Sequence, residues 1–180
     1  KKVAGPKGTI LHQILVAALD KANLKPDAVN FVSLGIPAGV NALMSGEVDA
    51  ALVAGSDVLR AQKAGARVLC NGEGLVDATI VIGVSGKLLK EHPEAVKKYL
   101  AIHQQNIDFM SKEQDKAYGF TAKETGLKLD EVKIMAPWYD FSTKITAKDI
   151  KDLEDTQEFL LKMGMQKKKI DIKSILAEVK

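Results

Sequence analysis

The segment that decides the fold is VNFVSLGIPAGVNALMSGEVDAALVAGSD, residues 29–57. It starts with an apolar run at 29–34, continues through Pro37, which suits the first position of a helix, and reaches a second apolar run at 49–54. The second run is apolar along most of its length, as in a parallel strand that is buried on both faces. A strand-helix-strand unit of this kind predicts two parallel strands joined by a helix.

The same alternation continues on both sides of this segment. Upstream, residues 2–5 indicate a short strand, and apolar residues between 9 and 22 recur with the helical period of about 3.6. Downstream, Ser56 can cap a third helix, and apolar runs at 66–70 and 78–84 predict two more strands. We therefore expect an α/β fold with a doubly wound parallel sheet.

The composition changes after Gly86, where helical patterns replace the alternation. Thr146 and Asp149 have the spacing of a capping box at the start of one of these helices. Helices with so few strands cannot form a layered domain of their own. We expect their apolar faces to pack either on the first half of the chain or on a sheet from residues that are not in this chain. The expected helices span residues 93–112, 114–124, 146–163 and 172–179.

Overall composition excludes several kinds of protein. The formal net charge of +3 over 180 residues is too small to indicate nucleic-acid binding, and no apolar run approaches the roughly 20 residues of a membrane span. Cys70 is the only cysteine, which excludes an internal disulfide and a thiolate zinc site. The three histidines are not at metal-ligand spacing, so we expect neither a metal nor another cofactor.

The candidate ligand site lies where helices follow strands. In an open parallel sheet, ligands bind at the carboxyl ends of the strands, where backbone N–H groups and helix dipoles favour an anion. The turn Lys7-Gly8-Thr9 fits best, because Gly8 allows close approach and the Thr9 hydroxyl can donate to a ligand or cap the helix. An ordinary capped turn would have the same sequence.

Three other residues belong to this candidate site. His12 lies one turn into the first helix, on the flank of its apolar stripe, where a neutral imidazole could donate one hydrogen bond or serve as a surface or hinge residue. Ser56 and Asp57 begin the third helix, where Asp57 either favours the helix dipole or contacts a cationic part of a ligand. His103, by contrast, falls on the apolar face of a long helix, where packing is expected.

Catalysis has little support in the sequence. No nucleophile-base pair stands out, the Gly-x-Ser-x-Gly elbow is absent, and nothing near Cys70 indicates an activated thiol. Trp138 and Tyr139 could stack on a ligand or seal a hinge, although burial in a core is the more common role for such a pair. We expect a protein that is not an enzyme.

Three quoted segments carry a resemblance to a known family. Residues 2–9 (KVAGPKGT) with His12, residues 45–51 (SGEVDAA) and residues 90–96 (KEHPEAV) resemble the nitrate, sulfonate and taurine group of ABC-transporter solute-binding proteins. The resemblance implies a periplasmic-binding-protein-like fold, with two α/β lobes that close on a small anionic or zwitterionic solute. It also implies delivery to an ABC permease in the membrane and an extracytoplasmic location, periplasmic or lipoprotein-anchored. It places Gly8, Thr9 and His12 where the second lobe meets the ligand.

The resemblance also implies a division of the chain. Residues 1–85 correspond to the second lobe, and residues 86–180 correspond to a return segment with C-terminal helices that pack on the first lobe, whose opening strands are not in this chain. Such a fragment could dimerise or swap segments. The chain departs from the family at residues 54–57, where AGSD replaces an aromatic-Glu-Pro sequence and could suit a different solute.

Two other classes share features with this chain. The effector-binding domain of a LysR-type transcription regulator has the same kind of fold, but it usually ends soon after the chain returns to its first subdomain. A thiamine-pyrimidine-synthesis enzyme family also resembles this group. The long helical tail favours the binding protein over the regulator, and the lack of a cysteine cluster or paired titratable groups favours it over the enzyme.

Overall fold

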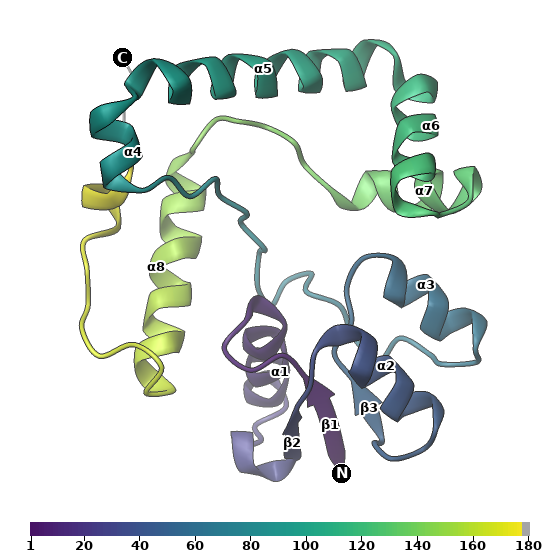
Figure 1. Ribbon diagram of the computed structural model, residues 1–180. Coiled ribbons are helices and arrows are strands. Elements are labelled where there is room, and N and C mark those ends of the chain that lie inside the picture. Colours follow the sequence, from purple (N-terminus) through teal and green to yellow (C-terminus); the bar gives the residue numbers. More distant parts are fainter. Residues whose placement is uncertain (178–180) are drawn as a thin grey trace. The chain divides into compact units, whose positions relative to one another are not determined.

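The computed structural model describes residues 1–177, which form two compact units. The first unit combines residues 1–79 with residues 147–170, and the second combines residues 80–146 with the segment that follows residue 170. The first unit contains the whole sheet (Figure 1).

Three parallel strands form the sheet of the first unit. They are β1 (Lys2–Gly5), β2 (Asn30–Ser33) and β3 (Ala50–Ala51), in the order β2-β1-β3. The pairing of β1 with β3 continues beyond β3, because the N–H of Leu52 donates to the carbonyl of Ala4 at 2.8 Å. These strands confirm the parallel sheet predicted from residues 2–5 and from the segment 29–57.

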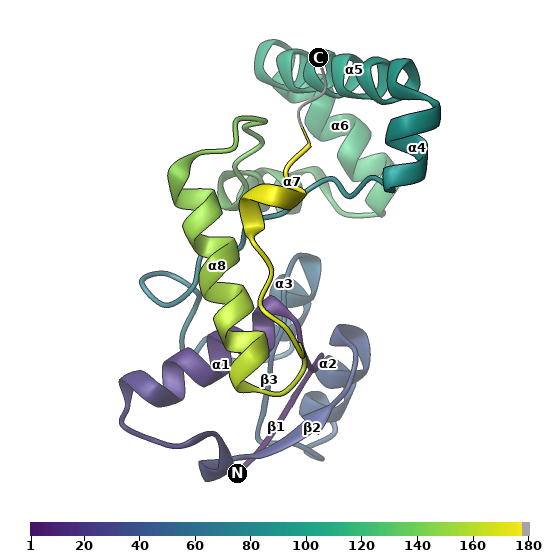
Figure 2. The same ribbon diagram turned by 90° about the vertical axis from the view of Figure 1, so that its left-hand side faces the viewer.

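Helices cover both faces of this sheet. Helix α1 (Ile10–Lys21) lies on one face and α2 (Ile36–Met44) on the other, as Figure 2 shows. Right-handed crossovers require this arrangement, because the chain moves from β1 to β2 in one direction and from β2 to β3 in the other. Helix α3 (Ser56–Lys63) contacts α2, and α8 (Ala147–Lys162) packs against α1.

Small side chains fill the space between the sheet and α2. Ala4, Ala42 and Val48 form a buried cluster. A Cβ atom added at Gly39 of α2 would lie 3.7 Å from the Cβ of Ala4, so the helix rests directly on the central strand. Partly buried hydrophobic residues surround the cluster: Val32, Leu34, Leu43 and Ala51.

Two predicted strands are absent from the described residues. The runs 66–70 and 78–84 are irregular, and several of their apolar side chains are exposed, including Leu69 at 70% and Ile80 at 85%. A strand needs a partner to accept its backbone hydrogen bonds, and neither run has one in this structure. The prediction of five strands was therefore wrong, although the doubly wound topology of the first three is confirmed.

The second unit is helical. Its helices are α4 (Gly86–Glu91), α5 (Pro93–Lys112), α6 (Gln114–Thr125) and α7 (Leu129–Met135), followed by the short 3-10 helix η2 (Ala136–Trp138). Each contacts the next along the chain. The predicted start and end of α5 are confirmed, and His103 on this helix is partly buried beside Tyr99, with ring centroids 6.2 Å apart.

Few apolar side chains of the second unit are buried. Val96, Ala117 and Val132 are enclosed, whereas Phe120 remains 64% exposed and Trp138 49% exposed. The predicted helix at 172–179 appears as a 3-10 helix, η3 (Ile172–Ile175), and Val179 lies outside the described residues. Within residues 1–177, none of the helices combines the length and the apolar composition that crossing a membrane requires.

Candidate functional site

The strand order creates a switch point at the carboxyl end of the sheet, between β1 and β3. Strands β1 and β3 are neighbours, but the helices that follow them start toward opposite faces, which makes their carboxyl ends a topological switch point. In open α/β sheets, ligands bind in the crevice outside such a point. The two loops at this crevice are residues 6–9, after β1, and residues 52–55, after β3.

The loop after β1 is a tight turn with its own hydrogen bonds. Gly8 has φ +76°, in the left-handed region that favours glycine, and its backbone N–H donates to Nδ1 of His12 at 3.3 Å. The Thr9 hydroxyl donates to the Pro6 carbonyl at 2.8 Å, so it neither caps α1 nor remains a free donor. The first backbone bond of α1 runs from Gln13 N–H to Thr9, which leaves the earlier N–H groups of the helix at the crevice.

His12 lies behind this turn. Its side chain is buried, stacks on Phe31 with ring centroids 4.4 Å apart, and meets the edge of Phe159 at 5.6 Å. Burial, together with the nearby charge of Lys7, lowers the pKa of His12 below its usual 6.5. The lowered pKa favours the neutral ring, which is enclosed and accepts a hydrogen bond at Nδ1.

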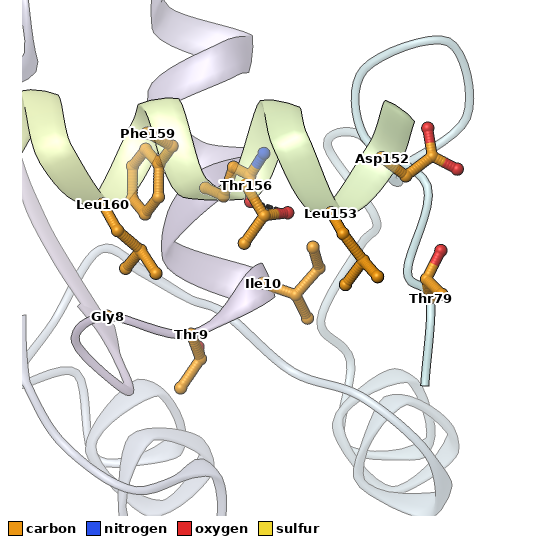
Figure 3. A pocket seen from close by; sticks show the side chains of 10 residues that line it. Gly8, Thr9, Ile10, Thr79, Asp152, Leu153, Thr156, Phe159 and Leu160 are labelled. Atoms are coloured by element: carbon orange, nitrogen blue, oxygen red, sulfur yellow. Dashed lines mark hydrogen bonds between the residues drawn. The ribbon is translucent and has the colours of Figure 1, made fainter. Parts of the chain in front are cut away.

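A cavity of about 130 Å³ opens between the start of α1 and α8. Figure 3 shows Leu153, Thr156 and Leu160 of α8 facing Ile10 of α1, with Gly8 and Thr9 along the turn beneath them. Its walls are mostly apolar. The cavity has room for a small group, not for a large ligand. Gln13, Thr79, Asp152 and Phe159 complete the lining.

Ser56 and Asp57 lie at the other side of the switch point. Both belong to the first turn of α3, whose N-cap is Gly55, so Ser56 is the first helical residue instead of the predicted cap. Asp57 forms an ion pair with Arg60 at 3.4 Å, and Arg60 also donates to the side-chain oxygen of Asn41. Asp57 therefore faces a cation one turn along its own helix, which reduces its repulsion of an anion.

A second cavity, of about 220 Å³, is acidic. Asp77, Asp152 and Asp155 line it, and Lys148 pairs with Asp77 and with Asp152, the latter at 3.2 Å. Lys151 pairs with Asp155 at 2.6 Å, so each of the three carboxylates has a lysine partner. Nowhere in the described part of the chain do three or more His, Cys, Asp or Glu side chains gather in a way that could hold a metal ion.

Of the six predicted residues, Ser56 and Asp57 lie in α3, and the other four lie in α1 or in the turn before it. Gly8 and Thr9 line the cavity, whereas Lys7 is exposed beside it and His12 is buried behind it. Arg60 was missed, although its spacing of three residues from Asp57 on a helix would have indicated it. The α8 residues in the lining lie some 140 positions away in the sequence and no local pattern signals them.

Comparisons with known proteins identify the family and the fold of the chain. The model of the family described as NMT1/THI5 like matches residues 1–117. The chain belongs to this family. Proteins of Brucella abortus (strain 2308) and Brucella suis biovar 1 (strain 1330), both provisionally named as binding proteins, are each 27% identical to the chain over 139 residues, covering 74% of it and 43% of the relative.

Solved structures show the same fold. The periplasmic aliphatic sulphonate binding protein SsuA from Escherichia coli superposes with a TM-score of 0.82 at 22% identity, covering 99% of this chain and 59% of that one. The alkanesulfonate-binding protein SsuA from Xanthomonas axonopodis pv. citri, bound to MOPS, gives a TM-score of 0.80 at 19% identity, covering 97% of this chain and 62% of that one. The periplasmic-binding-protein fold is thus shown for a chain that spans less than two thirds of these relatives.

Proposed function

We propose that this chain is part of an extracytoplasmic solute-binding protein that captures a small anionic or zwitterionic solute and delivers it to an ABC permease. The observation that carries the proposal is the turn at Gly8 and Thr9, which opens both on the switch point of the sheet and on a cavity. Family membership and the fold of periplasmic sulfonate-binding proteins support it.

The charges at the crevice favour a negative group on the solute. The positive end of α1 points to it, and Lys7 adds long-range attraction. Asp57, paired with Arg60, supplies a carboxylate at α3 that could meet a cationic group. A sulfonate with an attached amine, such as taurine, would satisfy both sides, so we place Lys7, Gly8, Thr9, Ser56 and Asp57 at the solute.

The lobe division belongs to the same proposal. Residues 1–85 would form one lobe, and residues 86–180 would return toward the other. Helix α8 of the return segment contacts α1, so part of that segment also covers the lobe that carries the site.

We propose binding without catalysis. His12, the residue at this site best suited to proton transfer, is enclosed by Phe31 and Phe159 and hydrogen bonded to the backbone, an arrangement typical of a structural histidine. The sequence also resembles a thiamine-pyrimidine-synthesis enzyme family, so catalysis is an outcome that the test below must be able to show.

Titration calorimetry of the full protein decides between these functions. We expect taurine or MOPS to bind, whereas N-propylmorpholine, which lacks the sulfonate of MOPS, should not. Lys7→Gln should weaken sulfonate binding in a salt-dependent way, and Lys128→Gln in the second unit serves as its matched control. Failure of every sulfonate to bind, or turnover of a bound compound seen by mass spectrometry, would contradict the proposal.

A further inference from the structure

His12 joins three parts of the first unit that are far apart in sequence. Its ring stacks on Phe31 of β2 at an interplanar angle of 18° and meets the edge of Phe159 of α8 at 85°. Its third contact is the backbone N–H of Gly8, in the turn itself. With only 4% of the residue exposed, His12 has little surface left for a solute.

The hydrogen bond from Gly8 fixes the state of the ring. A ring nitrogen accepts only when it carries no proton, so Nδ1 is bare and the proton of the neutral ring lies on Nε2. The lowered pKa of His12 agrees with this state. The donor is a glycine in the left-handed region, where the turn depends on a specific conformation.

A histidine that served only packing would need its ring but not this acceptor. Gly8 and Phe159 line the same cavity. The His12 ring accepts a hydrogen bond from Gly8 and contacts the edge of Phe159, so it supports both of these walls of the cavity. We propose that His12 is a positioning residue that holds the Gly8 turn against α8 without contacting the solute. The effect of His12 on solute binding rests on the proposed function, whereas its role in fixing the Gly8 turn does not.

Two variants separate the acceptor from the ring. His12→Phe keeps an aromatic ring between Phe31 and Phe159 but removes Nδ1. His12→Asn loses the ring, yet its side-chain oxygen can lie near the position of Nδ1 and accept from Gly8. The readout is hydrogen exchange of the Gly8 amide in the full chain, measured by nitrogen-edited NMR without any solute.

We expect the Gly8 amide to be protected in the wild type and in His12→Asn, and to exchange at least about tenfold faster in His12→Phe. Amides of α5 in the second unit provide the internal control. If His12→Asn does not fold, a pH titration of the wild type still tests the proposal. Protonation of Nδ1 removes the acceptor, so the NMR signals of the Gly8 amide and of the His12 ring should change with the same midpoint. Equal protection of Gly8 in His12→Phe and wild type, or independent titration, would overturn the proposal.

The binding arm uses MOPS as the probe. His12→Phe should lower its affinity by roughly three- to tenfold, the effect of one misplaced hydrogen-bond donor. If the wild type binds no MOPS, the proposed function fails for this sulfonate, while the Gly8 amide still decides whether His12 holds the turn. A mobile Gly8 turn with unchanged MOPS affinity would overturn the role of His12 in binding.

Discussion

The side chain of Gln157 forms two hydrogen bonds with the backbone of one residue, Ile170. It is 3% exposed, and its side-chain amide donates to the carbonyl of Ile170 at 3.0 Å and accepts from the N–H of the same residue at 2.7 Å. Gln166 donates to the same side-chain oxygen at 2.8 Å. One side chain of α8 thus satisfies both polar groups of a residue thirteen positions later.

Replacing Gln157 should destabilise the first unit. Gln157→Leu leaves the N–H and carbonyl of Ile170 without these partners, and each part-buried polar group left unpaired costs about 1–3 kcal/mol. We expect the free energy of unfolding, measured in urea, to fall by about that amount or more. Gln62→Leu, at an exposed position of α3, is the matched control and should change it by less than about 0.5 kcal/mol. If Gln157→Leu lowers the free energy of unfolding no more than the control does, the hydrogen bonds of Gln157 to Ile170 do not stabilise the first unit.

The lowered pKa of His12 predicts a pH dependence of stability. Because the folded state binds a proton less readily than the unfolded one, stability is complete above the unfolded value of about 6.5 and falls as the pH drops through the folded value. The slope in this window is at most about 1.4 kcal/mol per pH unit. Urea unfolding from pH 8 to pH 5 measures it.

His12→Phe is the control for that slope, since it removes the titrating group and keeps an aromatic ring. The pKa of Asp49 is also lowered, by Lys1 and by the N–H of Lys2, but its effect belongs to a lower window, below its usual 3.8. The same slope between pH 8 and pH 5 in both proteins would show that another group is responsible.

At the scale of elements, the spacing of β1 and β3 depends on one glycine. A Cβ atom added at Gly5 would lie 2.8 Å from the Cβ of Leu52 and 2.5 Å from its Cδ1, far inside van der Waals contact. Gly5→Ala therefore forces the two strands apart at the switch point.

We expect Gly5→Ala to destabilise the protein by about 1–3 kcal/mol, the usual effect of overpacking. Gly39→Ala is its matched control, because an added Cβ there would meet its nearest atom at an ordinary 3.7 Å. Adding Leu52→Ala to Gly5→Ala should restore part of the loss, and a double-mutant cycle of urea midpoints measures the coupling. Purely additive effects would show that the clash is relieved elsewhere.

Local patterns predicted the three strands and three α-helices of the first 63 residues and the long helix α5, because strand and helix periods can be recognised in neighbouring residues. They did not predict the short 3-10 helix η1 (Pro26–Ala28). They overpredicted strands at 66–70 and 78–84, since an apolar run indicates burial but cannot supply a partner strand. His12 shows the other limit. The helical wheel placed it on the flank of α1, and it is buried because α8 covers that flank with Phe159.

On the scale of the whole molecule, the second unit exposes many large apolar side chains. Ile102, Phe120 and Ile134 are between 47% and 64% exposed, on three different helices. Exposed apolar surface of this extent attracts apolar dyes.

The chain of residues 1–180 should therefore enhance the fluorescence of Nile red, an uncharged dye that no sulfonate site would select. Phe120→Ser together with Ile134→Ser should reduce the signal, whereas Thr121→Ser, on the same helix as Phe120, should leave it unchanged. A wild-type chain that does not affect the dye would show that these side chains are covered in solution.

The first unit is complete only when α8, in the last third of the chain, has been synthesised. Thr156 donates to the side-chain oxygen of Gln13 across 143 positions, and Phe159 reaches back to His12. As the polypeptide leaves the ribosome, the three strands can pair early, but α1 keeps an apolar flank open until α8 emerges. In a nascent chain stalled before residue 147, this apolar flank of α1 would stay exposed and could be bound by chaperones. Once α8 has been translated, it can cover the flank and displace them.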